Sequence, residues 1–466
     1  MKASLETAAS EAIAFLEGLE QMPVRATAGL ADLRGRLRRP LVAEGIPAER
    51  VLRDLVADVQ GGLNGSAGGR FFGWVIGGSV PAAIGADWLA SAWDQNAASY
   101  STSPAAAVVE EVAGEWLKSL LGLPSAASFA LVTGCQMAHL TCLAAARHAL
   151  LDQRGWDVET RGLFSAPVIR VISSSHRHGS VDRALRMLGI GTNQITEIPV
   201  GAEGRLDAGL LESALNDGPG APTVVVLQAG DLNIGAFDSF ADLIPIAKQY
   251  RAWVHIDGAF GLWAAASPRL RRCLSGAEMA DSWAADGHKW LNVPYDCGYA
   301  FVADESAHRS AMATRVNYIS YASEARDEGD WNPEWSRRAR GFPTYAAIRQ
   351  LGGTGIAKLV ENCCDHALDL VTRIGRLPGA EVLFTPTLNQ GLVRFIDRRE
   401  GAAPADHDRR TDAVIEAICA GGEALFSGTT WRGKRAMRVS VCSWQTSASD
   451  VECTVECVAR ALEAVV

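Results

Sequence analysis

The segment Ala285-Asp286-Gly287-His288-Lys289-Trp290-Leu291-Asn292-Val293-Pro294-Tyr295-Asp296-Cys297-Gly298 combines a lysine, a histidine and glycines between two apolar runs. A lysine amine forms an imine with an aldehyde, and a partly desolvated site favours its neutral, nucleophilic form. This chemistry indicates pyridoxal phosphate as the cofactor and Lys289 as the catalytic residue. A surface lysine in a turn has the same local sequence, so the other segments of the chain decide between the two interpretations.

The composition is that of a globular protein with a large core. The chain has 466 residues, of which 48% are hydrophobic and 21% charged, enough for two or three structural units. Its formal net charge of −9 leaves no broad basic surface, so we expect no nucleic-acid partner.

Cysteine usage and hydropathy bear on metal binding and location. The ten cysteines show no C-x-x-C or zinc-ligand spacing, so we expect small core residues in a reducing compartment and no metal site. The N-terminal residues are amphipathic and include acids, which argues against an export signal. Glycines, Pro81 and Asp87 interrupt the apolar stretch from Val75 to Ala98, which argues against a membrane span. We therefore expect a cytoplasmic protein with no membrane partner.

Residues 1–70 are expected to form an N-terminal helical arm. Apolar and charged residues alternate at helical spacing to about residue 60, with natural breaks at Pro23, Pro40 and Pro47. Such an arm is poorly suited to fold alone, so we expect it to pack on the main body or on a second subunit. The aromatic run that follows includes Phe72 and Trp74, which either line a substrate pocket or fill the core.

Between about residues 128 and 305, short apolar runs alternate with helical segments, a pattern that predicts an α/β fold with a mainly parallel sheet. The expected strands are Ser128–Val132, Val168–Ile172, Glu197–Val200, Thr223–Leu227, Trp253–Ile256, Ser282–Ala284 and Gly298–Val302. Functional loops in such sheets lie at the carboxyl ends of the strands.

Helical segments are expected on both sides of this region, and an α+β tail of the size of a small domain follows it. The expected helices are Ala82–Ala98, Ala105–Leu121, Met137–Leu150, Thr344–Leu351, Gly355–Leu377 and Ala448–Val465. The expected strands of the tail are Glu381–Phe384, Gly391–Phe395 and Ala436–Val441.

Three further segments at strand ends carry groups suited to the cofactor. Thr133–Ala138 opens a helix whose first backbone amides can bind a phosphate, although a generic strand-to-helix turn has the same pattern. His178 precedes another helix, where an imidazole stacks on a flat ring, transfers a proton or caps the helix. Asp257 ends an apolar run, where its carboxylate either keeps a pyridine nitrogen protonated, with small Ala259 leaving room for the ring, or caps the next segment. The combination of these groups at the strand ends of one sheet indicates a cofactor site more specifically than any single group does. The groups are a lysine, an acid, a histidine and an anion-binding turn.

The order of TGCQMAHL, SSSHRHGSVDRA, HIDGAFG and DSWAADGHKWLNVPYDCG resembles that of the group II pyridoxal-phosphate-dependent decarboxylases, which include the aromatic-amino-acid and glutamate decarboxylases. The similarity covers most of the chain. It implies a fold type I (aspartate aminotransferase-like) architecture with a seven-stranded sheet in a large domain over 71–343 and a small C-terminal domain over 344–466. It also implies a homodimer in which both subunits shape each active site.

The resemblance assigns roles to individual residues. Lys289 forms the Schiff base with pyridoxal 5′-phosphate, and Asp257 pairs with the pyridine nitrogen. His178 stacks on the ring, with Ala259 near the other face. The residues expected at the phosphate are Gly134, Cys135, Gln136, Ser282, His288 and Asn233, with Asp231 as an alternative to Asn233.

Two departures from the family affect the phosphate site. Leu232 stands where the family often has a threonine, which is why Asn233 or Asp231 is expected to serve instead. Asp286 stands where the family often has asparagine, and its charge argues against a phosphate contact because like charges repel.

A third departure bears on the reaction. Decarboxylases of this family use a loop tyrosine that is thought to protonate the carbanion. The segment Asn317–Trp335 has no tyrosine at the expected place, although Tyr318 and Tyr321 are nearby.

The leading expectation is an amino-acid decarboxylase, a carboxy-lyase that converts a small-molecule L-amino acid to the amine. The alternative keeps the cofactor but gives a carbon–carbon lyase, an aldehyde synthase or an aminotransferase. A third hypothesis is a non-enzymatic binding or scaffolding protein.

Overall fold

The computed structural model describes residues 1–314 and 324–465, and the chain folds into two compact units. One unit is Gly77–Cys364, and the other joins Met1–Ile76 to Asp365–Val466. The N-terminal arm and the C-terminal segment therefore belong to the same unit. The division at residues 70 and 343 that the sequence suggests stays a prediction.

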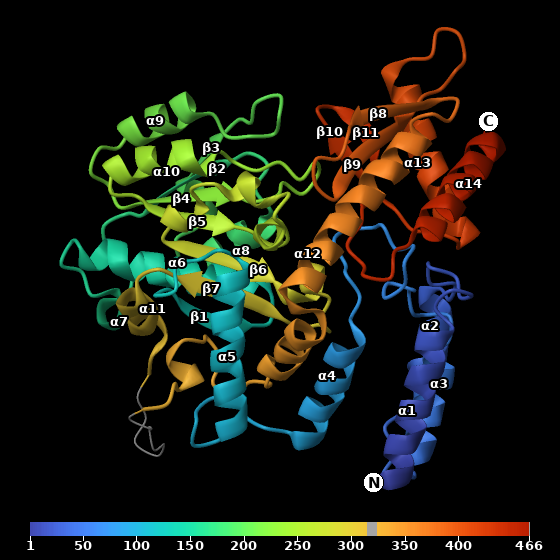
Figure 1. The fold of residues 1–466 in the computed structure, drawn as a ribbon, viewed down its shortest axis with the longest axis horizontal. Helices are drawn as coiled ribbons and strands as arrows, with labels where there is room; N and C mark the ends of the chain where they lie inside the picture. Colours follow the sequence, from blue (N-terminus) through green and yellow to red (C-terminus); the bar gives the residue numbers. More distant parts are fainter. Residues whose placement is uncertain (315–323, 466) are drawn as a thin grey trace. The chain divides into compact units, whose positions relative to one another are not determined.

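The larger unit is built around a seven-stranded sheet of order β1-β7-β6-β5-β4-β2-β3 (Figure 1). The strands are β1 (Ser128–Val132), β2 (Arg170–Ser174), β3 (Ile195–Ile198), β4 (Thr223–Gln228), β5 (Trp253–Asp257), β6 (Ser282–Asp286) and β7 (Gly298–Val302). Strand β7 is antiparallel to both of its neighbours, and every other adjacent pair is parallel. The prediction of an α/β fold with a mainly parallel seven-stranded sheet is confirmed.

The central strands form because they can be buried on both faces. Every residue of β4 and β5 is buried, and β4 carries a run of three valines. Branched apolar runs of this kind are typical of parallel strands covered by helices on each side. The helices of this unit are α4 (Pro81–Trp93), α5 (Pro104–Leu120), α6 (Cys135–Asp152), α7 (Val158–Arg161), α8 (Gly179–Met187), α9 (Ala208–Asn216), α10 (Phe240–Gln249) and α11 (Glu305–Met312), and α12 (Gly341–Ile374) begins in it.

Helix α12 contains the break that the sequence predicts between its two halves. Gly352 has φ 61° and ψ 173°, so the backbone leaves the helical conformation there. Glycine adopts positive φ without the steric cost that other residues meet. The break explains why the expected helices ended at Leu351 and resumed at Gly355.

Helix α6 connects the sheet to the candidate site. It begins three residues after β1 and packs on β5, β6 and β7. Most of its side chains are buried, and its small residues allow close packing on the strands. Its N-terminus therefore lies at the edge of the sheet where β5 and β6 end.

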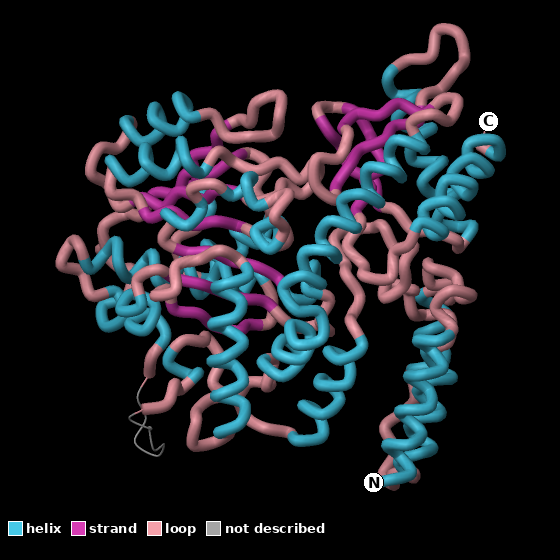
Figure 2. The backbone as a smooth tube through the Cα atoms, in the orientation of Figure 1, coloured by secondary structure: helices cyan, strands magenta, loops and turns pink. Residues whose placement is uncertain are grey.

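The smaller unit has a four-stranded antiparallel sheet of order β10-β11-β9-β8, drawn in magenta beside cyan helices in Figure 2. Its elements are α1 (Lys2–Glu17), α2 (Leu30–Leu37), α3 (Ala48–Val59), β8 (Ala380–Phe384), β9 (Gln390–Phe395), α13 (Pro404–Gly421), β10 (Ser427–Trp431), β11 (Lys434–Ser440) and α14 (Ala448–Ala464). The sequence did not predict α13 or β10. The first turns of α13 are almost entirely polar, and β10 is a short strand with exposed residues, so neither has a strong apolar pattern.

Phe72 lies in the core of this smaller unit. Its backbone N–H donates to the carbonyl of Leu425 at 2.8 Å, and its ring stacks on Phe426 with a centroid distance of 5.3 Å. The side chain has no exposed surface. The expected role of Phe72 in a substrate pocket is therefore wrong, because a fully covered ring cannot contact a ligand.

A close approach of two glycines fixes β7 against the start of α6. A Cβ atom at Gly298 would lie 2.5 Å from the Cα of Gly134, which is a backbone atom that cannot rotate away. We expect Gly298→Ala to lower the free energy of unfolding by about 1–3 kcal/mol or more, as overpacked cores do. The measurement is urea unfolding of the purified protein.

Gly85→Ala is the matched control. Gly85 lies in α4, and a Cβ atom there would meet no neighbouring side chain within 4 Å. Alanine also favours a helix by about 1 kcal/mol over glycine. Equal unfolding midpoints for the Gly298 and Gly85 variants would contradict the packing argument.

Candidate active site

Two buried carboxylates end neighbouring strands of the larger unit. Asp257 is the last residue of β5, and Asp286 is the last residue of β6. The strands are parallel and adjacent, so both carboxylates lie at the same edge of the sheet. Cys135, the first residue of α6, donates its backbone N–H to Oδ1 of Asp286 at 2.6 Å. Strand ends and a helix N-terminus thus converge at one place.

Lys289 lies beside Asp286 on a π-helical turn, Gly287–Leu291, that follows β6. Its Nζ is 3.2 Å from Oδ2 of Asp286. The turn is held by close backbone packing, since a Cβ at Gly77 would lie 1.9 Å from the carbonyl oxygen of Lys289. Single π-helical turns occur frequently at functional sites.

The protonation of Lys289 differs from the expectation. Burial alone would lower its pKa, but Asp286, and with it Asp257, stabilises the ammonium, and the pKa of Lys289 lies above its ordinary value. Burial alone would favour the neutral amine, whereas the raised pKa favours the ammonium. Two nearby carboxylates outweigh the loss of solvent.

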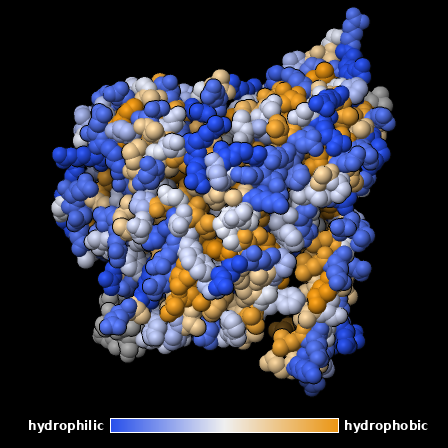
Figure 3. Space-filling view, in the orientation of Figure 1, coloured by the Kyte–Doolittle hydropathy of each residue, from blue (hydrophilic) through white to orange (hydrophobic). Residues whose placement is uncertain are grey.

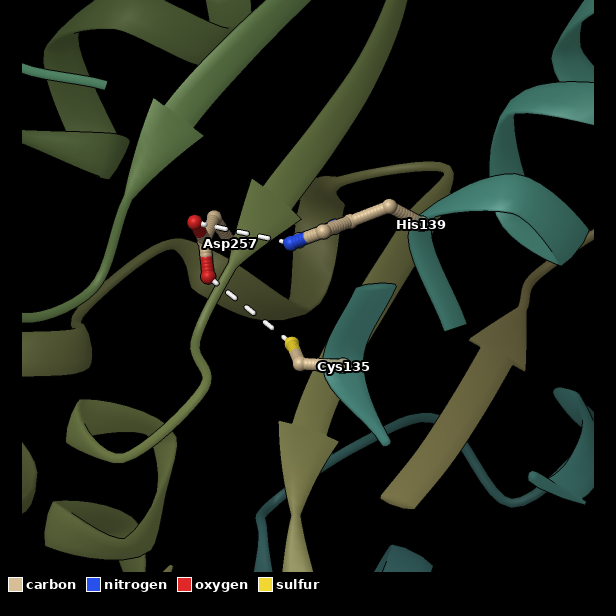
Figure 4. A group of neighbouring side chains, drawn as sticks. All are labelled: Cys135, His139 and Asp257. Atoms are coloured by element: carbon tan, nitrogen blue, oxygen red, sulfur yellow. Dashed lines mark hydrogen bonds and ion pairs between the residues drawn. The ribbon is translucent and has the colours of Figure 1, made fainter. Parts of the chain in front are cut away.

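Asp257 is surrounded by donors (Figure 4). Its Oδ1 accepts from the backbone N–H of Ala259 at 3.2 Å and lies 3.9 Å from Sγ of Cys135. Its Oδ2 lies 3.6 Å from Nε2 of His139. Burial by itself raises the pKa of Asp257, yet His139, Lys289 and the neighbouring donors hold the pKa below its ordinary value. Asp257 is thus a buried anion.

Cys135, His139 and Asp257 have the side-chain types of a metal site, and their ligand atoms lie within 4.8 Å of one another. Burial, reinforced by the charges of Asp286 and Asp257, raises the pKa of the Cys135 thiol well above its ordinary value. A metal ligand would be a thiolate. The neutral thiol instead suits a hydrogen bond to Asp257.

The start of α6 was expected to bind phosphate. The Cys135 amide is already paired with Asp286, and Gly134 is packed so that a Cβ would lie 3.1 Å from the ring of His288. The side chain of Gln136 contacts Sδ of Met187 at 3.8 Å. Gly134, Cys135 and Gln136 therefore lie in one region with His288, and Asp286 lies in the same region.

The two expected histidines are held in different ways. The ring of His288 stacks on Tyr295 at a centroid distance of 4.3 Å, and its Nδ1 accepts from the N–H of Cys297 at 3.2 Å. Burial lowers the pKa of His288. His178 is exposed and caps α8, with Nδ1 2.7 Å from Oγ of Ser180, and its charge contributes to the low pKa of Asp257.

Ser282 is placed away from the other residues expected at the phosphate. It begins β6, whereas Asp286 ends it, and four residues of strand span roughly 13 Å. Its Oγ accepts from Nε1 of Trp253 and lies 2.9 Å from Nδ1 of His255. The expected phosphate contact is therefore wrong for Ser282, because its hydroxyl is used in the protein interior.

Other expected residues have more local roles in the structure. The N–H of Asn233 donates to Oδ1 of Asp231 at 2.9 Å, which stabilises the turn after β4. Trp74 is 54% exposed and belongs to the smaller unit. Tyr318 and Tyr321 lie outside the described residues.

Sequence reasoning missed His139. Cys135 and His139 are four residues apart on α6, so their side chains lie on the same helix face. This spacing, read with the turn expected to bind phosphate, was the signal available. The partner of His139 on β5, His255, could not be inferred without the contact between α6 and the sheet.

The residues present fit pyridoxal phosphate. A primary amine, a buried anion and a helix N-terminus lie at one sheet edge, and they match an aldehyde, a ring nitrogen and a phosphate. Nε2 of His139 is buried without a hydrogen-bond partner in the described chain, next to the carboxylate expected to face the ring.

Comparison with known proteins agrees with this chemistry. Residues 37–396 match the family model described as the pyridoxal-dependent decarboxylase conserved domain. The chain is 27% identical to the aromatic-L-amino-acid decarboxylase of Bacillus atrophaeus, over 94% of this chain and 90% of that protein. It is 25% identical to the 4-hydroxyphenylacetaldehyde synthase of Rhodiola rosea, over 89% of this chain and 85% of that protein.

A solved structure agrees in fold. The structure of Oryza sativa TDC with PLP and tryptamine matches with a TM-score of 0.93 at 24% identity, covering 100% of this chain and 98% of that one. The predictions of fold type I architecture, of pyridoxal phosphate as cofactor and of an amino-acid decarboxylase are confirmed. With a family model that matches most of its length, this chain belongs to the pyridoxal-dependent decarboxylase family.

Proposed function

We propose that this enzyme decarboxylates an aromatic L-amino acid to the amine, with Lys289 as the residue that binds the cofactor's aldehyde. The observation that carries the proposal is the position of Lys289 and the anionic Asp257 at adjacent strand ends. The substrate class is supported by the Bacillus relative, which is named an aromatic-L-amino-acid decarboxylase. Trp74 stays a candidate for the substrate pocket.

We propose the remaining roles from the resemblance to the family. The cofactor, when bound, supplies an electron sink for the electrons left as carbon dioxide departs. Asp257 is proposed to keep a proton on the ring nitrogen, because an anion stabilises a nearby N–H⁺. His178 and Ala259 are proposed at the two faces of the ring. The residues proposed for the phosphate are Gly134, Cys135, Gln136, His288 and Asn233.

An aldehyde-forming reaction is the second candidate. It is favoured by the Rhodiola relative, which is named an aldehyde synthase and aligns over most of this chain. The products separate the two reactions. We expect the enzyme to release carbon dioxide and amine in equal amounts from one or more of tryptophan, tyrosine and phenylalanine. Aldehyde or keto acid as the main product would replace the leading proposal with the alternative.

We also propose a homodimer in which both subunits shape each active site. The arm α1–α3 exposes many apolar side chains, and Figure 3 shows orange residues along it. Val51, Leu55 and Val56 of α3 are 46%, 50% and 40% exposed. Exposed apolar stripes on helices are typical of subunit contacts.

We also propose that the protein is located in the cytoplasm. All ten cysteines lie in the described chain and are free thiols, which supports a reducing compartment such as the cytoplasm. Across residues 1–314 and 324–465, we find no helix with the length and hydrophobicity needed to traverse a bilayer.

The dimer proposal predicts the effect of charge on α3. We expect Leu55→Glu with Val51→Glu to shift the protein from dimer to monomer in analytical ultracentrifugation, because a buried unpaired charge costs several kcal/mol. The control is Arg53→Glu, an exposed position on the same helix. An unchanged dimer in the double variant would remove the arm from the proposed interface.

The role of Lys289 predicts a loss of colour. Lys289→Ala should abolish the visible absorbance of the purified protein after incubation with pyridoxal phosphate, and decarboxylation should fall by at least about 10³-fold. Lys358→Ala removes an exposed lysine from α12, and this variant should keep both the absorbance and the decarboxylation activity. A Lys289 variant that retains the absorbance band would place the cofactor bond elsewhere.

The pair of Asp286 and Lys289 predicts a pH effect. The carboxylate raises the pKa of Lys289, so Asp286→Asn should lower that pKa and move the alkaline rise in the rate of cofactor uptake by the apoprotein to lower pH. Each unit of pKa lowered increases the neutral amine about tenfold at neutral pH. Stopped-flow absorbance measures the rate.

Asp242→Asn, an exposed change on α10, is the control for this measurement. A pH profile of Asp286→Asn that coincides with the wild type would show that Asp286 does not set the charge of Lys289.

A further inference from the structure

A chain of buried polar side chains leads from Asp257 into the protein interior. Nδ1 of His139 lies 2.9 Å from Nε2 of His255, and Nδ1 of His255 lies 2.9 Å from Oγ of Ser282. Trp253 ends the chain, with its Nε1 2.9 Å from the same hydroxyl. All four side chains are buried, and both imidazoles are fully covered.

The end of this chain faces Asp257. Nε2 of His139 lies 3.6 Å from Oδ2 of Asp257, which is longer than a hydrogen bond. The same atom is buried and has no hydrogen-bond partner in the described chain. An unpaired buried N–H is costly, so the carboxylate is the group that offsets its burial. Hydrogen bonds at such sites are often long before ligands bind.

The carboxylate of Asp257 sets the direction of the hydrogen bonds in this chain, because it favours an N–H over a lone pair at Nε2 of His139. The indole of Trp253 can only donate, so Ser282 accepts there and its own O–H is free to donate to Nδ1 of His255. His255 then carries its proton on Nε2 and donates to Nδ1 of His139. The reverse direction would aim a lone pair of His139 at a carboxylate, which is repulsive.

The resulting tautomer places the proton of His139 on the nitrogen that faces Asp257. Burial lowers the pKa of both histidines, that of His255 to about 3, so each ring is neutral and carries one proton. His139 therefore contributes an N–H without adding a full charge. The charge of Asp257 is left available for the ring nitrogen of the cofactor.

We infer that His139 is a positioning residue for Asp257, held in one tautomer by the hydrogen-bonded chain that begins at Trp253. The inference rests on the proposed role of Asp257. His139 does not contact the cofactor in this assignment. Its Nε2–H orients the carboxylate of Asp257 and stabilises the ionised form of that carboxylate.

Cofactor affinity of the apoprotein tests the inference without relying on turnover. We expect His139→Leu to weaken binding of pyridoxal phosphate about 10- to 100-fold by equilibrium dialysis, the scale of one hydrogen bond to a charged group. The absorption maximum of the bound cofactor should shift as well. His139→Gln keeps an N–H donor and should recover most of the affinity. His255→Leu, which removes the tautomer lock but leaves His139 in place, should show a smaller loss.

His308→Leu is the matched control. His308 is a fully buried histidine of the same unit, with Nδ1 2.8 Å from Oγ of Ser128 and Nε2 2.9 Å from the carbonyl of Trp331. It should lower the unfolding midpoint of the apoprotein and leave the cofactor affinity unchanged. If His139→Leu and His308→Leu weaken the affinity equally, His139 is a core residue and the inference is overturned.

A double-mutant cycle separates the inference from the proposed function. If His139 acts through Asp257, the combination of His139→Leu with Asp257→Asn should bind the cofactor no more weakly than Asp257→Asn alone. A loss in Asp257→Asn with none in His139→Leu or His255→Leu overturns the inference and leaves the proposed function intact. No loss in Asp257→Asn overturns the proposed role of Asp257 itself.

Discussion

Two carboxylates buried side by side impose the main constraint on this protein. Asp257 and Asp286 end adjacent parallel strands, and burying each charge is unfavourable unless donors surround it. The helix N-terminus at Cys135, the ammonium of Lys289 and the backbone N–H of Ala259 provide those donors. These donors reach the two strand ends because of the position of α6, the π-helical turn and the close glycine contacts.

The sequence predicted which candidate residues lie at the ends of strands. Lys289 and Asp257 could be identified because each follows a buried apolar run, and parallel strands bring their carboxyl ends to one edge. The surroundings of Ser282 and His139 could not be predicted, because they depend on which face of the sheet α6 covers and on the register of β5 with β6. The prediction that Phe72 lines a substrate pocket was wrong for a related reason, since an aromatic run is equally compatible with a core and with a pocket.

The sequence also predicted the fold in part. The bounds of β1 and β7 were correct, and the gap between the expected helices Thr344–Leu351 and Gly355–Leu377 contains the break at Gly352. The helix α13 and the strand β10 were missed because their packing partners, rather than their own patterns, stabilise them. The direction in which the pKa of Lys289 shifts also could not be predicted, because it reflects a balance between burial and the charge of Asp286, which only three-dimensional contacts define.

The smaller unit is assembled from both ends of the polypeptide, and this has a consequence for biosynthesis. Met1–Ile76 must wait for Asp365–Val466, and a ribosome adding about 5–20 residues per second takes roughly 15–60 s to make the segment between them. Phe72 and its neighbours remain without Leu425 and Phe426 during that interval. The apolar side chains of Met1–Ile76 that pack on Asp365–Val466 therefore stay uncovered until that second segment has been synthesised.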